Sequence, residues 1–354
     1  MAKRTQIAIV GAGIFVKTQY IPRLSEISDL VSVKYIWSRS EESARSAVGL
    51  ARKNFAEVEC KWGDAGLDDI MQDSSITAVA VVLAGQFQVD ISLRLLKAGK
   101  HVIQEKPAAA NIAEAEKALL DYKAFCADSP SGPYWAVAEN YRFEPGFSEG
   151  RKLVKELGDL MSVQVIVEGS MNSSNPYFSS SWRHNFTGGF ILDMGVHMIA
   201  GLRLLVGELG SVSAFASHVD KSLPPPDTIS STFKLENGCP GTFVMVVSSS
   251  SPKIFWRVVG LKGAVQIERG NVNGQHGYMV RKFNADGQFT EAFYPFSGVT
   301  DELKMFLNNV NSEGSPAKYD PRLSYTEGAR DVAVLEAMLE SAAKQGAAVP
   351  VKKF

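Results

Sequence analysis

Three features that mark other classes of protein are missing from this sequence. It has only three cysteines, Cys60, Cys126 and Cys239, which are far apart and odd in number, so we expect a reducing compartment. It has no run of about 18 apolar residues, so no membrane-spanning segment and no membrane partner are expected. It has no tract of Lys and Arg, and its formal net charge is −1, which argues against a nucleic-acid partner.

Signatures of other catalytic classes are also missing. The sequence has no G-x-S-x-G motif and no Cys/His pairing that would support hydrolase chemistry. Its five histidines show no zinc or facial-triad spacing, so no metal is expected. The first residues run directly into the apolar segment 7–10, which leaves no room for a signal peptide and predicts a cytoplasmic protein.

What is present is the composition of an ordinary globular protein. Hydrophobic residues make up 45% of the chain and charged residues 21%, and 354 residues are too many for one ordinary core. We therefore expect two domains, residues 1–141 and 142–354, with the C-terminal helices packing back on the first domain.

The first 140 residues alternate short apolar runs with longer amphipathic stretches. This alternation is typical of βαβ units and predicts an α/β domain with the doubly wound parallel sheet of a Rossmann fold. The expected strands are residues 6–10, 31–37, 78–83, 101–104 and 135–138, and the clearest helices are residues 41–54 and 89–98.

The pattern changes after about residue 145. Short strand-like runs joined by tight turns follow one another, and helical patterns return near the C-terminus. We expect a C-terminal α+β domain with a largely antiparallel sheet. Its expected strands are residues 161–168, 212–218, 228–235, 241–248, 255–261 and 264–269, and its expected helices are residues 150–157, 301–309 and 325–344.

A glycine turn follows the first expected strand. The run is Gly11-Ala12-Gly13-Ile14-Phe15-Val16, and a helix is expected within residues 14–25. Gly11 permits the tight turn, and Gly13 lets backbone N–H groups approach a pyrophosphate at the helix N-terminus, beside Ile14 and Phe15. The third glycine of the full fingerprint is replaced by Val16, so it is the position between strand and helix that predicts dinucleotide binding.

The end of the second strand bears on the choice of cofactor. A site for NAD usually places Asp or Glu there to bond the ribose 2′-hydroxyl, whereas this strand ends in Trp37-Ser38-Arg39-Ser40, with no acid before Glu41. The hydroxyl of Ser38 and the guanidinium of Arg39 suit a 2′-phosphate, because arginine pairs bidentately with phosphate. We therefore expect NADP(H) rather than NAD(H). The alternative is that Arg39 is a solvated surface residue.

Two further segments resemble motifs of the Gfo/Idh/MocA oxidoreductase family. Residues 98–107, AGKHVIQEKP, resemble its "GKHV…EKP" signature, and residues 182–197, with Trp-Arg, Gly-Gly and a final Asp-x-x-x-His, resemble its "WR…GG…L.D.G.H" stretch. The resemblance extends over essentially the whole chain and is strongest to cytosolic members from plants and fungi. It implies hydride transfer between a nicotinamide and a carbinol carbon of a sugar, polyol or related small molecule.

The resemblance implies that Lys106, Asp193 and His197 form the catalytic group. Alcohol oxidation needs a group that accepts the hydroxyl proton, and a lysine beside a cationic nicotinamide or an imidazole can do this near neutral pH. Asp193 and His197 are four residues apart, so on a helix they share a face. Our hypothesis is that His197 is the main proton donor and acceptor while Lys106 orients the same oxygen. The competing interpretation is an exposed loop lysine and a surface Asp/His pair.

The resemblance also places residues around cofactor and substrate. Glu105 and Lys106 of the EKP motif are expected beside the cofactor. Many relatives have "TP…H" after the fourth strand, where this chain has Leu83-Ala84-Gly85-Gln86-Phe87. We still expect Leu83 and Gln86 near the cofactor, because ligands bind beyond the carboxyl ends of such strands. The residues expected to reach substrate are Asn140, Tyr141, Trp182 and Arg183, although Asn140 and Tyr141 could equally be packing residues at the domain junction.

The sequence therefore predicts an NADP(H)-dependent oxidoreductase acting on a sugar, polyol or related compound. Two alternatives stay open: a dinucleotide-sensing regulatory protein without catalysis, and a dehydrogenase acting on dihydrodiols. Relatives cover the second domain's sheet by dimerising, so a homodimer or homotetramer is expected.

Overall fold

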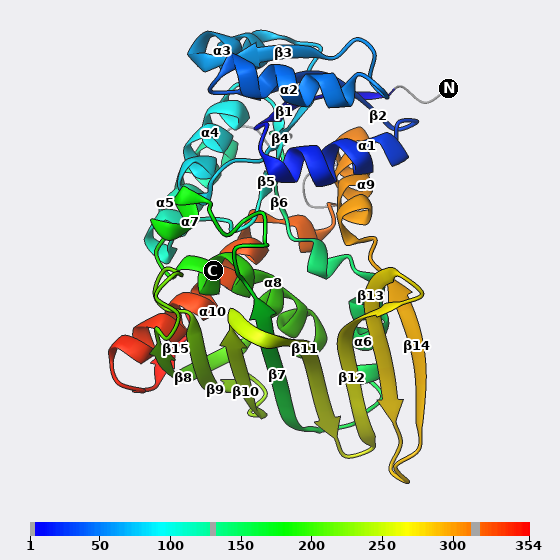
Figure 1. Ribbon diagram of the computed structural model, residues 1–354, viewed down its shortest axis with the longest axis vertical. Helices are drawn as coiled ribbons and strands as arrows, with labels where there is room; N and C mark the ends of the chain where they lie inside the picture. Colours follow the sequence, from blue (N-terminus) through cyan, green and yellow to red (C-terminus); the bar gives the residue numbers. More distant parts are fainter. Residues whose placement is uncertain (1–3, 128–131, 313–318) are drawn as a thin grey trace. The chain divides into compact units, whose positions relative to one another are not determined.

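The computed structural model describes residues 4–127, 132–312 and 319–354 (Figure 1). The chain forms two compact units: Met1–Glu139 with Val299–Ala329, and Asn140–Gly298 with Arg330–Phe354. The domain boundary expected at residue 141 stays a prediction. The expectation that no signal peptide is present involves residues 1–3, which lie outside the described residues.

The first unit contains a six-stranded sheet in the order β3-β2-β1-β4-β5-β6, and every neighbouring pair is parallel. This confirms the predicted Rossmann-type sheet. Its strands are β1 (Thr5–Val10), β2 (Val31–Ser38), β3 (Glu59–Trp62), β4 (Ala78–Val81), β5 (His101–Glu105) and β6 (Trp135–Ala138). The order reverses between β1 and β4, which is where ligands bind in sheets of this type.

Strand burial explains which strands the sequence reveals. All four residues of β4 are buried, as a strand covered on both faces requires, and its continuous apolar run made it easy to recognise. Strand β3, with the sequence ECKW, lies at the sheet edge and has no buried residue. It carries no apolar signal, and the sequence did not predict it.

The helices of the first unit connect these strands in sequence. They are the π-helical turn η1 (Val16–Tyr20), α1 (Ile21–Glu26), α2 (Glu41–Ala51), α3 (Gly63–Gln72), α4 (Gly85–Lys97) and α5 (Ile112–Ala127). The hydroxyl of Ser40 accepts a hydrogen bond from Ser43 N at 3.4 Å and caps α2. Later in the chain, α9 (Gly298–Asn311) joins this unit, since Asn311 Oδ1 accepts from the Thr5 hydroxyl at 2.7 Å.

The second unit contains a nine-stranded sheet in the order β14-β13-β12-β11-β7-β10-β9-β8-β15 (Figure 1). Its pairs are antiparallel except for β10 with β7, so the predicted largely antiparallel sheet is confirmed. The strands are β7 (Leu160–Ser170), β8 (Leu209–Ser217), β9 (Thr228–Leu235), β10 (Pro240–Val246), β11 (Ser248–Gly260), β12 (Gly263–Val272), β13 (Gln275–Phe283), β14 (Phe289–Pro295) and β15 (Val349–Pro350).

One face of this sheet is packed against helices. The helices of the unit are the short η2 (Asn140–Arg142), α6 (Pro145–Val154), α7 (Ser181–His184), α8 (Gly189–Val206) and α10 (Tyr325–Ala343), whose first turn belongs to the other unit. Helix α6 packs on β12 and β13, and α8 packs on β7 and β9. In the central strand β7, Val163, Val165 and Val167 are fully buried, while Ile166 between them is half-buried. The alternation shows that the other face is not covered to the same extent.

Helix α8 is the most apolar long helix among those that the structure describes in full. It is long and apolar enough to cross a membrane, with a mean hydropathy of 1.6 over 18 residues, although Asp193 and Arg203 interrupt it. However, 78% of this segment is buried inside the protein, which is typical of a core helix in a globular unit.

Candidate functional site

In the first unit the ends of three neighbouring strands meet at the predicted glycine turn. Gly11 N, directly after β1, donates to Trp37 O of β2 at 2.9 Å, and Val82 N, directly after β4, donates to Val10 O at 2.8 Å. These bonds place the turn, the end of β2 and the start of α4 together at the carboxyl ends of the parallel strands. The strand order reverses at this end of the sheet, between β1 and β4.

The two glycines of the turn have different reasons to be glycine. Gly11 has φ +133°, and a Cβ there would lie 2.1 Å from Val82 O, so no side chain fits. A Cβ on Gly13 would meet nothing within 4 Å, so the protein's own packing does not require a glycine at this position. An open backbone at the first turn of a helix is what the pyrophosphate of a dinucleotide needs for close approach. The residues present therefore fit a dinucleotide.

The helix that follows the turn begins at the predicted place. Lys17 N donates to Gly13 O at 3.2 Å, and Ile14 in the first turn is 41% exposed. Phe15 packs edge-on against Tyr20, with ring centroids 5.8 Å apart. Val16, at the position of the missing third glycine, is fully buried and starts the π-helical turn η1.

At the end of β2 the structure brings Arg39 close to an aromatic ring that the sequence did not single out. Ser38 is half-buried and Arg39 exposed, and the Arg39 guanidinium lies 5.8 Å from the centre of the Phe87 ring. Phe87 is 53% exposed and follows Gln86 in the first turn of α4, while Leu83 is half-buried just after β4. The exposed guanidinium of Arg39 and the exposed ring of Phe87 thus lie together at the carboxyl ends of the strands.

Strand β5 ends in a buried acid, Glu105. The Tyr20 hydroxyl donates to Glu105 Oε1 at 2.8 Å, and both side chains are buried. Burial raises the pKa of Glu105 to about 7, although the positive charge of Lys106 and the hydrogen bond from Tyr20 act in the opposite direction. Lys106 follows directly, is half-buried, and is joined to Pro107 by a cis peptide bond.

In the second unit two consecutive glycines set the start of α8. Gly188 and Gly189 have φ +78° and +50°, and a Cβ on either would approach a neighbouring side chain, Leu339 or Pro224, to 2.9 Å. The Gly-Gly pair therefore directs the chain into the helix that carries Asp193 and His197. These two residues lie one turn apart, as their spacing predicts.

Asp193 is buried and paired with an arginine of the same unit. Arg183 Nε, in α7, donates to Asp193 Oδ2 at 2.7 Å, and its Nη1 donates to the Ser180 hydroxyl at 3.0 Å. The guanidinium also lies 4.2 Å from the Trp182 ring centre and 4.8 Å from that of Tyr177. The structure thus joins Arg183, expected at the substrate, to the expected catalytic carboxylate.

His197 is half-buried and stacks on Tyr141. The two rings are nearly parallel, at 19°, with centroids 4.9 Å apart. Asn140, the residue before Tyr141, donates from Nδ2 to Glu144 Oε1 at 3.1 Å. In the described residues, no group of three or more His, Cys, Asp and Glu side chains could hold a metal ion.

The interactions that sequence reasoning missed join residues far apart in the chain. Tyr20 and Glu105 are 85 residues apart, and the ion pair between Arg142 and Asp331 spans 189 residues. No local pattern links such positions. Phe87 could have been proposed from the sequence, because it directly follows Gln86, which is expected near the cofactor beyond the end of the fourth strand.

Comparison with known proteins gives the family of both parts of the chain. Residues 5–123 match a family described as "Oxidoreductase family, NAD-binding Rossmann fold", and residues 151–352 match the "Oxidoreductase family, C-terminal alpha/beta domain". The dehydrogenase FPY6 of Fusarium mangiferae is 32% identical over 370 residues, which cover 98% of this chain and 99% of that protein.

Two further similarities concern a partial sequence match and the fold. The scyllo-inositol 2-dehydrogenase (NADP+) IolW of Bacillus subtilis is 27% identical over 215 residues, covering 59% of this chain and 54% of that protein. A levoglucosan dehydrogenase solved in complex with NADH superposes with a TM-score of 0.80 at 21% identity, covering 99% of this chain and 100% of the other. Because the two family matches span most of the chain, the protein belongs to the Gfo/Idh/MocA family of NAD(P)-dependent oxidoreductases.

Proposed function

We propose that the protein is an NADP(H)-dependent oxidoreductase that moves a hydride between the nicotinamide and a carbinol or carbonyl carbon of a sugar, polyol or related small molecule. One observation carries the cofactor choice: β2 ends at Ser38 and is followed directly by Arg39, and no carboxylate stands where a ribose 2′-hydroxyl would be bonded.

The surroundings of Arg39 support this choice. The first acid after β2, Glu41, accepts a hydrogen bond from Arg45 Nε at 2.8 Å within α2. A planar guanidinium can pair with a 2′-phosphate and stack on an adenine ring. Phe87, 5.8 Å from Arg39, adds an apolar surface for the adenine.

The proposed catalytic group is Lys106 with Asp193 and His197. When bound, the nicotinamide supplies the hydride acceptor or donor. In oxidation, the hydroxyl proton passes to His197 as the hydride leaves the same carbon, and in reduction His197 returns the proton to the new alkoxide. Lys106 orients and polarises that oxygen. Asp193, held by Arg183, positions the lysine or the imidazole, or helps to bind the substrate hydroxyls.

The names of the relatives support a polyhydroxylated substrate. One acts on scyllo-inositol with NADP+, and another is named for levoglucosan. On the basis of the family resemblance, the residues that we propose on the substrate side are Asn140, Tyr141, Trp182 and Arg183.

The alternatives to this function can be separated. A chain that retains Lys106, Asp193 and His197 fits an enzyme better than a regulatory protein without catalysis. A panel of substrates that includes a dihydrodiol distinguishes a sugar or polyol dehydrogenase from a dihydrodiol dehydrogenase.

We also propose a cytoplasmic homodimer or homotetramer. None of the three cysteines forms a disulfide, as a reducing compartment requires. In the second unit, Val244, Ile166 and Phe255 stand in register on neighbouring strands β10, β7 and β11, on the face away from α6 and α8. All three are half-buried apolar residues, and the same face of a second copy would cover them.

The testing experiment is a titration with NADPH and NADH, followed by tryptophan fluorescence. We expect NADPH to bind more tightly than NADH, and Arg39→Ala to weaken NADPH at least tenfold, roughly 1.4 kcal/mol, with little effect on NADH. Arg52→Ala, at the other end of α2, is the matched control and should bind like wild type. Equal loss for both cofactors in Arg39→Ala would refute the 2′-phosphate assignment.

The same preparations test the catalytic group. Lys106→Met and His197→Ala should still bind NADPH and should each lose at least about a hundredfold in turnover on a substrate found by screening. Near-wild-type turnover in both variants would contradict the assignment.

A further inference from the structure

His197 rests on a closed aromatic platform in the second unit. Tyr141, which stacks on the imidazole at 4.9 Å, is only 6% exposed. Behind it lie three more rings, with centroids 5.6 to 6.1 Å from that of Tyr141: Phe147, Trp256 and Tyr278. Parallel stacking on one ring leaves the imidazole little freedom to rotate, because the platform cannot move away from it.

Polar contacts fix the platform as well. The hydroxyls of Tyr141 and Tyr278 share a hydrogen bond, and Tyr278 is fully buried. Trp256 Nε1 donates to the backbone oxygen of Met198 at 3.2 Å, directly after His197 in α8. The same ring cluster therefore holds both the face of Tyr141 and the backbone beside the histidine.

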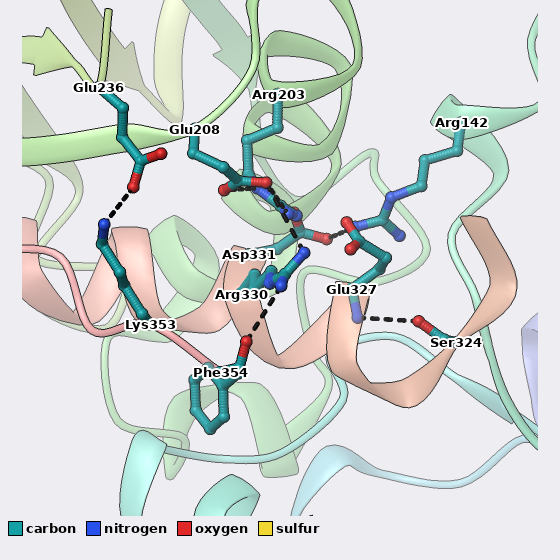
Figure 2. A network of polar contacts seen from close by, with 10 residues as sticks. All are labelled: Arg142, Arg203, Glu208, Glu236, Ser324, Glu327, Arg330, Asp331, Lys353 and Phe354. Atoms are coloured by element: carbon teal, nitrogen blue, oxygen red, sulfur yellow. Dashed lines mark hydrogen bonds and ion pairs between the residues drawn. The ribbon is translucent and has the colours of Figure 1, made fainter. Parts of the chain in front are cut away.

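A buried ionic network also joins η2, which carries Tyr141, to α8, which carries His197 (Figure 2). Arg142, the neighbour of Tyr141 in η2, forms an ion pair with Asp331 of α10. The other oxygen of Asp331, Oδ1, accepts from Arg203 Nη1 at 2.6 Å. Arg203 is on α8, six residues after His197, and the side chains of Arg142, Asp331 and Arg203 are 4%, 1% and 3% exposed.

The chemistry of this network favours a geometric role. The network contains two guanidinium groups and the carboxylate of Asp331. Glu208 provides a second carboxylate, since Arg203 Nε and Nη2 donate to its two oxygens at 2.9 and 2.7 Å. Buried ion pairs add little net stability compared with apolar residues, because desolvation offsets their attraction. What such a pair does fix is the relative position of its elements, here η2 with Tyr141 and α8 with His197.

We propose that Tyr141 and Asp331 are positioning residues for His197. The Tyr141 ring sets the plane of the imidazole, and the Asp331 carboxylate holds η2 and α8 in register through Arg142 and Arg203. This proposal rests on the proposed proton-transfer role of His197. Under this proposal Tyr141, which the family resemblance places on the substrate side, acts through the imidazole of His197.

The test uses the full chain without cofactor, labelled with 13C at histidine Cε1. The chain has five histidines, and a His197→Gln variant identifies the His197 resonance. We expect that resonance to be shifted upfield by the Tyr141 ring. The shift should persist in Tyr141→Phe and disappear in Tyr141→Leu. Phe283→Leu, in a different ring contact of the same sheet, should leave it unchanged.

The ionic network is tested by the same resonance. Asp331→Asn should move or broaden the His197 signal and leave that of His101, in the first unit, in place. Glu236→Gln breaks the exposed pair with Lys353 seen in Figure 2 and serves as the control. If Asp331→Asn does not fold, Arg142→Lys keeps a charge opposite Asp331 but loses the planar fork, and makes the same comparison.

The outcomes separate this proposal from the proposed function. A His197 signal that is the same in wild type, Tyr141→Leu and Asp331→Asn would overturn the positioning role, even if His197→Gln is inactive. Full turnover in His197→Gln would overturn the role of His197 in the reaction, and with it the catalytic meaning of the platform. Loss of kcat with unchanged KM in Tyr141→Leu, rescued in Tyr141→Phe, would support both.

Discussion

Glu105 shows how one buried side chain makes stability depend on pH. Its ordinary pKa of 4.5 is raised to about 7 in the folded protein, mainly by burial. Between these values the folded protein keeps the proton while the unfolded chain loses it. The free energy of unfolding therefore falls as pH rises from about 4.5 to about 7, and then levels off. The full difference is on the order of 3 kcal/mol.

Glu105→Gln should remove this dependence. Glutamine keeps an oxygen that can accept the hydrogen bond from Tyr20, but it does not ionise. The melting temperature of Glu105→Gln relative to wild type, measured without cofactor, should therefore rise from pH 5 to about pH 7 and level off by pH 8. The control Glu57→Gln, at an exposed position, should show no such trend. A difference that stays constant over this range would contradict the buried, proton-holding state of Glu105.

At the scale of the element, the turn after β1 separates folding from binding. Gly11 has a positive φ and faces Val82 O, whereas a Cβ on Gly13 would enter open space. Gly11→Ala should therefore lower the free energy of unfolding by at least about 2 kcal/mol. Gly13→Ala should change it by less than about 1 kcal/mol and yet weaken NADPH binding by roughly tenfold or more.

Two measurements check this pair of variants. Thermal unfolding without cofactor reports the folding cost, and a fluorescence titration with NADPH reports the binding cost. The variants serve as controls for each other, since both add one methyl group to the same turn. If Gly13→Ala bound NADPH like wild type, the backbone at Gly13 would not be the point of close approach.

The sequence predicted those strands and helices whose buried residues form a regular apolar pattern along the chain. Strand β4 is apolar at every position, and α8 places Asp193 and His197 one turn apart. The hairpin of β13 and β14 was missed because β14, at the edge of the sheet, has no buried residue and β13, next to it, has only three.

The candidate site likewise has a part that the sequence predicts and a part that it does not. The glycine turn after β1 and the residues Ser38 and Arg39, at and directly after the end of β2, could be predicted, because each lies within a few residues of a recognisable strand. The partners of the predicted residues could not, since Tyr20 reaches Glu105 and Tyr141 reaches His197 only through the folded chain. Sequence motifs thus identified which side chains to examine, and tertiary contacts show what holds them.

At the scale of the whole molecule, the uncovered face of the nine-stranded sheet bears on the oligomeric state. Val244, Ile166 and Phe255 form an apolar row at its centre, and Gln164 and Arg257 form part of the next, polar row. An apolar centre with a polar surround is the usual anatomy of an interface between subunits. A stable dimer buries about 1,200 to 2,000 Å² in total, an area that a sheet of this size can provide.

A charge in this row should dissociate the proposed oligomer. Phe255→Glu would place a carboxylate opposite apolar residues of the second copy, where it has no partner and loses its hydration. In sedimentation velocity we expect wild type to run at twice the monomer mass or more, and Phe255→Glu to run as a monomer with an unchanged circular dichroism spectrum. Phe289→Glu, on the edge strand β14 and already 54% exposed, should stay assembled. A wild-type monomer would refute the oligomer, and an assembled Phe255→Glu would move the interface to another surface.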